Sequence, residues 1–170
     1  MKTEGEIRRI ETQIETWVKS QGLWGDCRFS SYLDYKNAEP WKDNPVVTIF
    51  LSEGEFNRIF EGNNGLYDEF WTMLNNHGYY FERDICRLYI LSLNDQWNER
   101  FKDYFRWQWI CSLLKPDFND VHHEVFEHFA KNPDGMYKLT WREFEILIYE
   151  VLRNQGFAVD LGPGRGMMVV

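Results

Sequence analysis

The sequence predicts an α+β (or α/β) fold, with a mixed sheet and aromatic-rich helices. Apolar residues recur at helical spacing in several segments, and short β-branched or alternating runs lie between those segments. The chain has 170 residues, of which 44% are hydrophobic and 18% aromatic. This length and composition can supply a sizeable core and exclude wholesale disorder.

The first half of the chain alternates between helical and extended patterns. Residues 4–21 place Ile and Trp side chains on one helical stripe, and residues 46–51 form a continuous β-branched run typical of an interior strand. Ser52 and Glu55 have the spacing of a capping box, which predicts a short helix. Residues 66–76 have the apolar spacing of a further helix.

The second half continues the alternation. Residues 79–93 alternate well enough for a strand or hairpin, and residues 94–114 predict a long helix with aromatic side chains on nearly every side. A helix that is apolar all round is normally buried. Residues 121–131 predict another helix, and residues 132–135 (Asn-Pro-Asp-Gly) a turn.

The last segment has the clearest local signals. Thr140 and Glu143 have capping-box spacing at the start of a strongly apolar helix. Phe144, Leu147 and neighbouring aliphatic residues predict its buried face. Gly156 predicts the end of the helix, because a left-handed C-terminal cap favours a residue without a β-carbon. Residues 157–161 then alternate as a strand does.

The pairs Phe144-Glu145 and Gly156-Phe157, followed by Val159, carry a resemblance to a known family. Residues 139–166 resemble the opening of the Mrr-type restriction endonuclease domain, a branch of the PD-(D/E)xK nuclease superfamily. The family continues with an Asp-Gly-Gly-x-Asp motif that binds metal, and then an acid-x-Lys or Gln-x-Lys strand. The resemblance implies Mg²⁺-dependent hydrolysis of DNA in an intact parent protein, as a bacterial defence against foreign DNA.

The resemblance implies three parts: a recognition or regulatory domain of unknown family over residues 1–132, a linker over 133–138, and a truncated nuclease start over 139–170. Met167-Met168-Val169-Val170 stands where the metal-binding motif is expected. The codons GAT GAT GGT GGT for Asp-Asp-Gly-Gly, read one nucleotide out of phase, encode Met-Met-Val-Val. A frameshifted or otherwise truncated nuclease gene is therefore the hypothesis.

Glu145 is the candidate catalytic acid, at the rim of the helix's apolar stripe, and the alternative is an ordinary solvated helix position. One acid cannot complete a metal site, so we expect Mg²⁺ in the intact parent but not in this chain, which would bind without cutting. Arg165, Gly164 and Gly166 are candidates for approaching DNA. The alternative for them is a flexible turn.

Three further patterns favour ordinary structural roles. The run from His122 to His128 lacks the spacing of two zinc-binding histidines on one helix face, which predicts a solvated face. Asp160 is expected to face outward from its strand. The basic and aromatic residues over 100–109 fit a buried helix with Lys and Arg side chains reaching solvent, or alternatively a base-stacking surface.

Net charge and cysteine usage bound the setting. The net charge of −8 argues against a chain wrapped in nucleic-acid backbone, and the three cysteines have no paired or metal-ligand spacing. No apolar run is long enough for a membrane span, so a cytoplasmic bacterial protein is expected.

The competing hypothesis is a small, non-enzymatic interaction or ligand-sensing protein that forms a homo-oligomer through its aromatic-rich helices. The two hypotheses differ in whether residues 139–161 stand apart or join the N-terminal sheet.

Overall fold

The computed structural model describes residues 2–34, 44–61, 65–114, 123–161 and 167–169. Its contacts divide the chain into two compact units, residues 1–106 (unit 1) and residues 107–170 (unit 2). The division falls inside a helix, whereas the sequence analysis placed it at residues 133–138. The physical reason is that Val125 and Phe129 share a hydrophobic core with Ile146 and Leu147.

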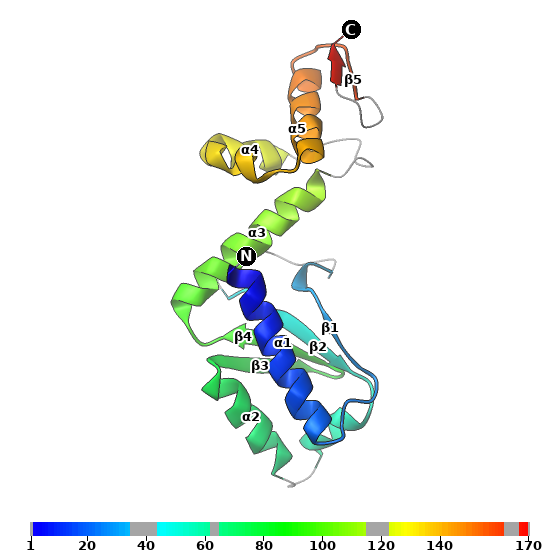
Figure 1. The fold of residues 1–170 in the computed structure, drawn as a ribbon, viewed down its shortest axis with the longest axis vertical. Helices are drawn as coiled ribbons and strands as arrows, with labels where there is room; N and C mark the ends of the chain where they lie inside the picture. Colours follow the sequence, from blue (N-terminus) through cyan, green and yellow to red (C-terminus); the bar gives the residue numbers. More distant parts are fainter. Residues whose placement is uncertain (1, 35–43, 62–64, 115–122, 162–166, 170) are drawn as a thin grey trace. The chain divides into compact units, whose positions relative to one another are not determined.

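Unit 1 is an α+β unit, as the sequence predicts, and its helices and strands alternate along the chain (Figure 1). Its elements are α1 (Lys2–Ser20), β1 (Cys27–Ser30), a 3-10 helix (Tyr32–Asp34), β2 (Thr48–Ser52), a 3-10 helix (Glu55–Phe60), α2 (Leu66–Asn76), β3 (Tyr79–Asp84), β4 (Arg87–Ser92) and the first part of α3 (Asp95–Leu113). The observed bounds of α2 are those that its apolar spacing predicts.

The four strands form one sheet in the order β1-β2-β4-β3. Every pairing in it is antiparallel, so the mixed sheet expected from the sequence is corrected. Only Ile85 and Cys86 separate β3 from β4, and a connection this short can join antiparallel strands but not parallel ones. β2 lies between β1 and β4, which confirms the interior strand predicted from its β-branched run.

One face of this sheet carries the core of unit 1. The register places Phe29, Phe50 and Leu88 opposite one another across three strands, and side chains at paired positions project from the same face. Figure 1 shows α1 lying across the sheet, and its Ile10 and Ile14 are fully buried in the same cluster. The Phe50 ring lies 4.9 Å from the Phe56 ring and 5.3 Å from the Phe29 ring, centroid to centroid. Aromatic packing therefore dominates this core.

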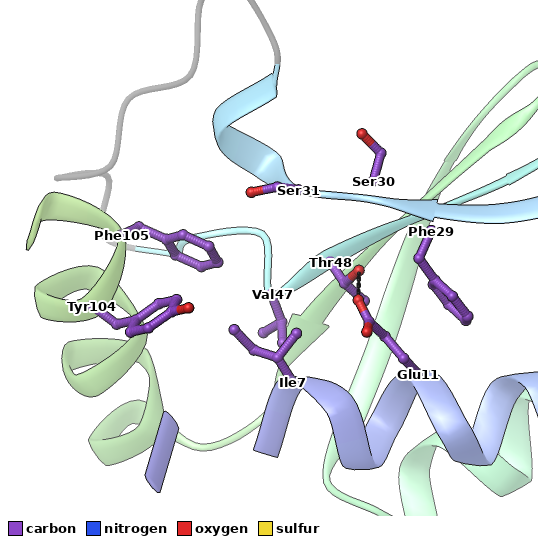
Figure 2. A pocket seen from close by; sticks show the side chains of 9 residues that line it. All are labelled: Ile7, Glu11, Phe29, Ser30, Ser31, Val47, Thr48, Tyr104 and Phe105. Carbon is purple, nitrogen blue, oxygen red and sulfur yellow. Dashed lines mark hydrogen bonds between the residues drawn. The ribbon is translucent and has the colours of Figure 1, made fainter. Parts of the chain in front are cut away.

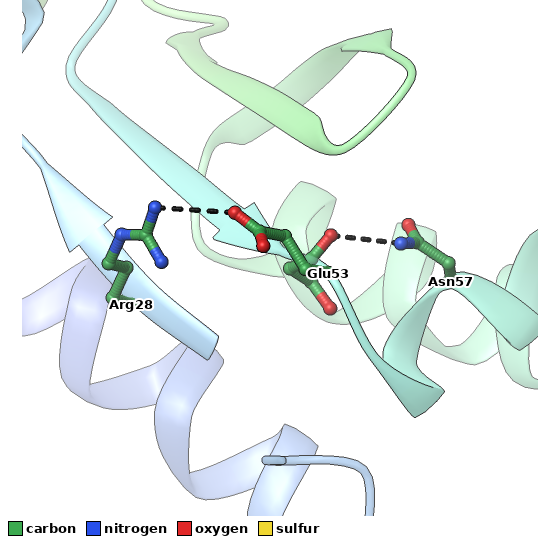
Figure 3. A network of polar contacts seen from close by, with 4 residues as sticks. Arg28, Glu53 and Asn57 are labelled. Carbon is green, nitrogen blue, oxygen red and sulfur yellow. Dashed lines mark hydrogen bonds and ion pairs between the residues drawn. The ribbon is translucent and has the colours of Figure 1, made fainter. Parts of the chain in front are cut away.

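The predicted capping box at Ser52 and Glu55 is wrong. Ser52 ends β2, where its backbone N–H donates to the Cys86 carbonyl at 3.0 Å, so the chain is still extended there. The 3-10 helix follows Gly54, with no side-chain hydrogen bond at its start. Figure 3 shows the local contacts instead: Asn57 donates to the Ser52 carbonyl at 2.9 Å, and Arg28 lies 3.4 Å from Glu53.

Unit 2 contains the end of α3 and a small helical core. Its further elements are α4 (His123–Lys131), a 3-10 helix (Pro133–Lys138), α5 (Trp141–Asn154), β5 (Val159–Leu161) and β6 (Met167–Val169). Residues 133–138 are thus helical rather than the predicted linker. A β-carbon on Gly135 would lie 3.4 Å from the Phe129 ring, so this turn packs closely on the core.

The local signals around α5 are confirmed. Thr140 and Glu143 form a capping box, in which the Glu143 backbone N–H donates to the Thr140 hydroxyl oxygen at 3.3 Å and the Thr140 N–H donates to the Glu143 carboxylate at 2.7 Å. Gly156 has a φ of +86°, the left-handed conformation that favours glycine. β5 pairs antiparallel with β6, a strand that the sequence analysis did not predict.

Candidate functional site

Glu145, the predicted catalytic acid, lies in the buried face of α5. Glu145 is only 4% exposed. The prediction that it lies at the rim of the apolar stripe is therefore wrong. The carboxylate Oε2 lies 3.3 Å from Nη1 of Arg142, and Oε1 has no hydrogen-bond partner among the described residues. A buried carboxylate with one unsatisfied oxygen is unusual, because such groups are normally paired.

The reason for this placement is that α5 packs against the core of unit 2 with a different face from the predicted one. Ile146 and Leu147 face the core, with Glu145 and Glu150 beside them. Phe144 and Ile148 are half-buried and line an outer hollow instead. Glu150 is likewise paired within its helix, at 3.4 Å from Arg153.

The described residues do not fit a magnesium site. Mg²⁺ requires near-octahedral oxygen coordination, usually with more than one group supplying oxygens beside water. In the part of the chain that the structure describes, no group of three His, Cys, Asp or Glu side chains could hold a metal ion.

The other predicted site residues are not brought together with Glu145. Arg165, Gly164 and Gly166 lie outside the described residues. Asp160 is exposed on β5, as expected for an outward-facing strand residue.

The predicted solvated face of α4 needs correction at His128. His122 lies outside the described residues, and His128 packs on aromatic rings, with ring centroids 6.2 Å from Trp107 and 5.2 Å from Phe129. This packing follows from the position of α4 in the core of unit 2, where Phe129 is buried.

Two of the basic residues of α3, Arg100 and Lys102, form ion pairs with acids. Arg100 lies 3.2 Å from Glu6, and Lys102 lies 3.7 Å from Glu99. α3 is not buried all round, however: Phe101 is buried, while Arg106 is exposed. Paired charges of this kind favour the structural role over a base-stacking surface.

Unit 1 contains a cavity with polar and apolar walls that the sequence analysis did not predict. It has a volume of about 300 Å³ and lies where β1 ends and β2 begins, between α1 and α3 (Figure 2). Nine of the described residues line it: Ile7, Glu11, Phe29, Ser30, Ser31, Val47, Thr48, Tyr104 and Phe105.

Glu11 supplies the carboxylate of this cavity. It projects from α1 towards β2, where the Thr48 hydroxyl donates to its Oε1 at 2.7 Å (Figure 2). Burial raises the pKa of the Glu11 carboxyl above its ordinary value, while the Thr48 hydrogen bond and the charge of Arg8 act in the opposite direction. Burial also raises the pKa of the Tyr104 phenol. The cavity thus disfavours an uncompensated negative charge.

A signal for Glu11 was present in the sequence. It lies four residues after Ile7 and three before Ile14, so a carboxylate occupies the apolar stripe of an amphipathic helix. Apart from Ile7, the other lining residues lie in or next to β1, β2 and α3, far apart in the chain. Only the folded sheet brings them together.

Unit 2 has an apolar hollow on its outer surface. Pro133, Met136 and Leu139 line it together with the aromatic residues Tyr137, Trp141 and Phe144. Tyr137 is 90% exposed and Trp141 is 72% exposed. Exposed aromatic side chains in one patch are typical of interaction surfaces.

No family model, no curated protein and no solved structure matches this chain. Among the described helices, none is both long and apolar enough to cross a bilayer.

Proposed function

We propose that residues 139–161 are the entrance to an Mrr-like DNA endonuclease domain, and that residues 1–132 form a recognition part that responds to DNA, a ligand or a partner. The parent protein would hydrolyse DNA in the cytoplasm of a bacterium with Mg²⁺. This chain by itself would bind without cutting, because Glu145 is one candidate acid where a metal site needs several ligands.

The observation that carries this proposal is the separation of the β5–β6 hairpin from the four-stranded sheet. A terminal helix and strand that merely completed unit 1 would be expected to extend its sheet. The order of helix, Gly156 cap and strand is also the order that the resemblance requires. A second supporting observation is that Oε1 of Glu145 has no hydrogen-bond partner among the described residues, although Oε2 pairs with Arg142.

A nuclease assay tests the proposal. The assayed protein includes the additional residues that the downstream DNA encodes in the frame containing Asp-Gly-Gly-x-Asp. With Mg²⁺ or Mn²⁺, the extended protein should cut DNA, and Glu145→Gln should reduce the rate at least ~100-fold if the acid acts on the metal. Glu150→Gln is the matched control, since Glu150 is equally buried on the same helix and also pairs with an arginine.

Two results would contradict the proposal. One is the absence of that motif from every downstream frame. The other is an extended, folded protein that leaves DNA intact with both metal ions. Equal losses in Glu145→Gln and Glu150→Gln would assign Glu145 a purely structural role.

The exposed aromatic patch of unit 2 favours a second function, a non-enzymatic protein that forms homo-oligomers. Tyr137 and Trp141 would then pack against a second copy of the chain. Light scattering over a concentration series would give a dimer that Trp141→Ser converts to a monomer. A monomeric wild-type protein at all concentrations would exclude this alternative.

A further inference from the structure

The cavity of unit 1 has one charged lining residue, Glu11, and none of its described lining residues is Lys or Arg. Anionic ligands such as phosphates or carboxylates would therefore meet a carboxylate with no compensating cation among the described lining residues. Arg8, whose charge lowers the pKa of Glu11, forms an ion pair with Glu4 at 2.6 Å. The charge of the described lining thus disfavours anionic ligands.

The same carboxylate favours a ligand with the opposite charge. Because Glu11 lies on the apolar stripe of α1, its carboxylate loses some of its hydrogen bonds to water. The one hydrogen bond from Thr48 replaces only some of those that are lost. A protonated nitrogen would form a charge-assisted hydrogen bond with the carboxylate, which is stronger than a neutral one.

The rest of the wall fits an apolar body attached to that nitrogen. Phe29, Tyr104 and Phe105 provide aromatic side chains, and Ile7 and Val47 are aliphatic (Figure 2). Aromatic faces also attract cations. Ser30 is less available, because its hydroxyl is 3.1 Å from the Asp34 carboxylate to which it donates. A volume of 300 Å³ corresponds to roughly ten water molecules, and so to a ligand of roughly ten non-hydrogen atoms.

We propose that this cavity binds a small organic cation, with an amine or amidine nitrogen against the Glu11 carboxylate and a flat apolar body against Phe29, Tyr104 and Phe105. The inference deepens the recognition role proposed for residues 1–132 and rests on it. Glu11 accepts the hydrogen bond and supplies the charge, Thr48 fixes the carboxylate, and the rings select the body of the ligand.

Benzylamine and benzamidine are suitable probes, with benzyl alcohol and benzoate as neutral and anionic counterparts of similar size. Each is titrated into the full chain and followed by amide NMR shifts. Both cations should shift the amides of Thr48 and the neighbouring strand, and should bind at least tenfold more tightly than the alcohol or the anion.

Two variants distinguish binding at Glu11 from a general effect of removing a negative charge from α1. Glu11→Gln should weaken cation binding at least tenfold, because glutamine keeps the Thr48 hydrogen bond but loses the charge. Glu15→Gln is the matched control on the same helix, outside the cavity and paired with Lys19, and should bind as the wild type does.

The inference is overturned if neither cation produces shifts at Thr48, if benzyl alcohol or benzoate binds as tightly, or if folded Glu11→Gln retains the affinity. The nuclease assay is independent of this titration. A cavity that binds no cation leaves the cleavage result intact, and an inactive extended protein leaves the titration intact.

Discussion

At the scale of single residues, the molecule contains polar groups in places where apolar ones would be more stable. Glu11, Glu145 and Glu150 all lie on helix faces that pack against a core. Glu145 and Glu150 have arginines three residues away on their own helices, whereas Glu11 has a hydroxyl from a strand. The Glu11 carboxylate thus accepts a hydrogen bond from another element, the Thr48 hydroxyl of β2. For this reason we assign a ligand to Glu11.

The Glu11 carboxyl should make the stability of the protein depend on pH. Its folded pKa lies above the ordinary value of 4.5, so the folded state binds the proton more tightly than the unfolded chain. Ionisation of Glu11 therefore lowers the free energy of unfolding. This loss of stability is absent below pH ~4, where the carboxyl is protonated in both states, and it grows as the pH rises through the folded pKa. Glu11→Gln should therefore melt about 1–3 °C higher than wild type at pH 7, and at the same temperature at pH 4.

Thermal unfolding followed by circular dichroism at both pH values measures this difference. A Glu11→Gln protein that is less stable than wild type at pH 7 would contradict the assignment of the pKa shift to burial. Increased stability with weakened cation binding would show that the binding loss is not caused by misfolding.

Cys111 should be chemically inert in the folded protein. Burial, with a contribution from the charge of Glu143, raises the pKa of its thiol to about 11. Because only the thiolate reacts, its alkylation at pH 8 should be roughly 100-fold slower than in urea, where the pKa is about 8.5, and should accelerate with rising pH. Iodoacetamide labelling with peptide mass spectrometry measures both rates, and comparable rates would refute the expectation.

At the scale of elements, sequence reasoning succeeded where a local signal fixes the structure. Thr140, Glu143 and Gly156 delimit α5 correctly, because caps act on neighbouring backbone groups. It failed for the buried stripe of α5, since that stripe depends on α3 and α4. It also failed at Ser52, where pairing with Cys27 of β1 and a hydrogen bond to the Cys86 carbonyl keep the backbone extended.

Loss of the Thr140 cap should destabilise α5. Thr140→Ala removes the hydroxyl that accepts from the Glu143 N–H, which should cost about 1 kcal/mol of unfolding free energy. Thr12→Ala is the control, because the Thr12 hydroxyl donates to the Arg8 carbonyl within α1, where alanine is well tolerated. Hydrogen exchange of α5 peptides measures the difference. Equal effects in both variants would argue against a capping role.

At the scale of the whole molecule, the sequence predicted an α+β chain with two parts, and the structure has an α+β chain with two cores. The first core is centred on residues such as Phe50 and the second on residues such as Ile146, with no shared member. The sheet direction and the cavity could not be predicted, because both depend on contacts between distant segments. The nuclease assignment remains a proposal carried by residues 139–161.

Each core can be tested separately. Phe50→Ala should cost about 3–5 kcal/mol and Ile146→Ala about 2–5 kcal/mol, since both side chains are buried. Hydrogen exchange should show lost protection in unit 1 for the first variant and in unit 2 for the second. Uniform loss of protection throughout the chain in both variants would show that the two cores unfold as one.

The strand order of the four-stranded sheet has a kinetic consequence. β3 and β4 are joined by a two-residue turn, whereas β1 reaches β2 only after the 17 residues from Ser31 to Val47 have been traversed. Closing a longer loop loses more chain entropy, so the β3–β4 hairpin should form early and β1 should dock late. Pulse-labelling hydrogen exchange during refolding should protect β3 and β4 amides before those of β1. Because β1 also forms one wall of the cavity, cation binding should become possible only at the last step of folding.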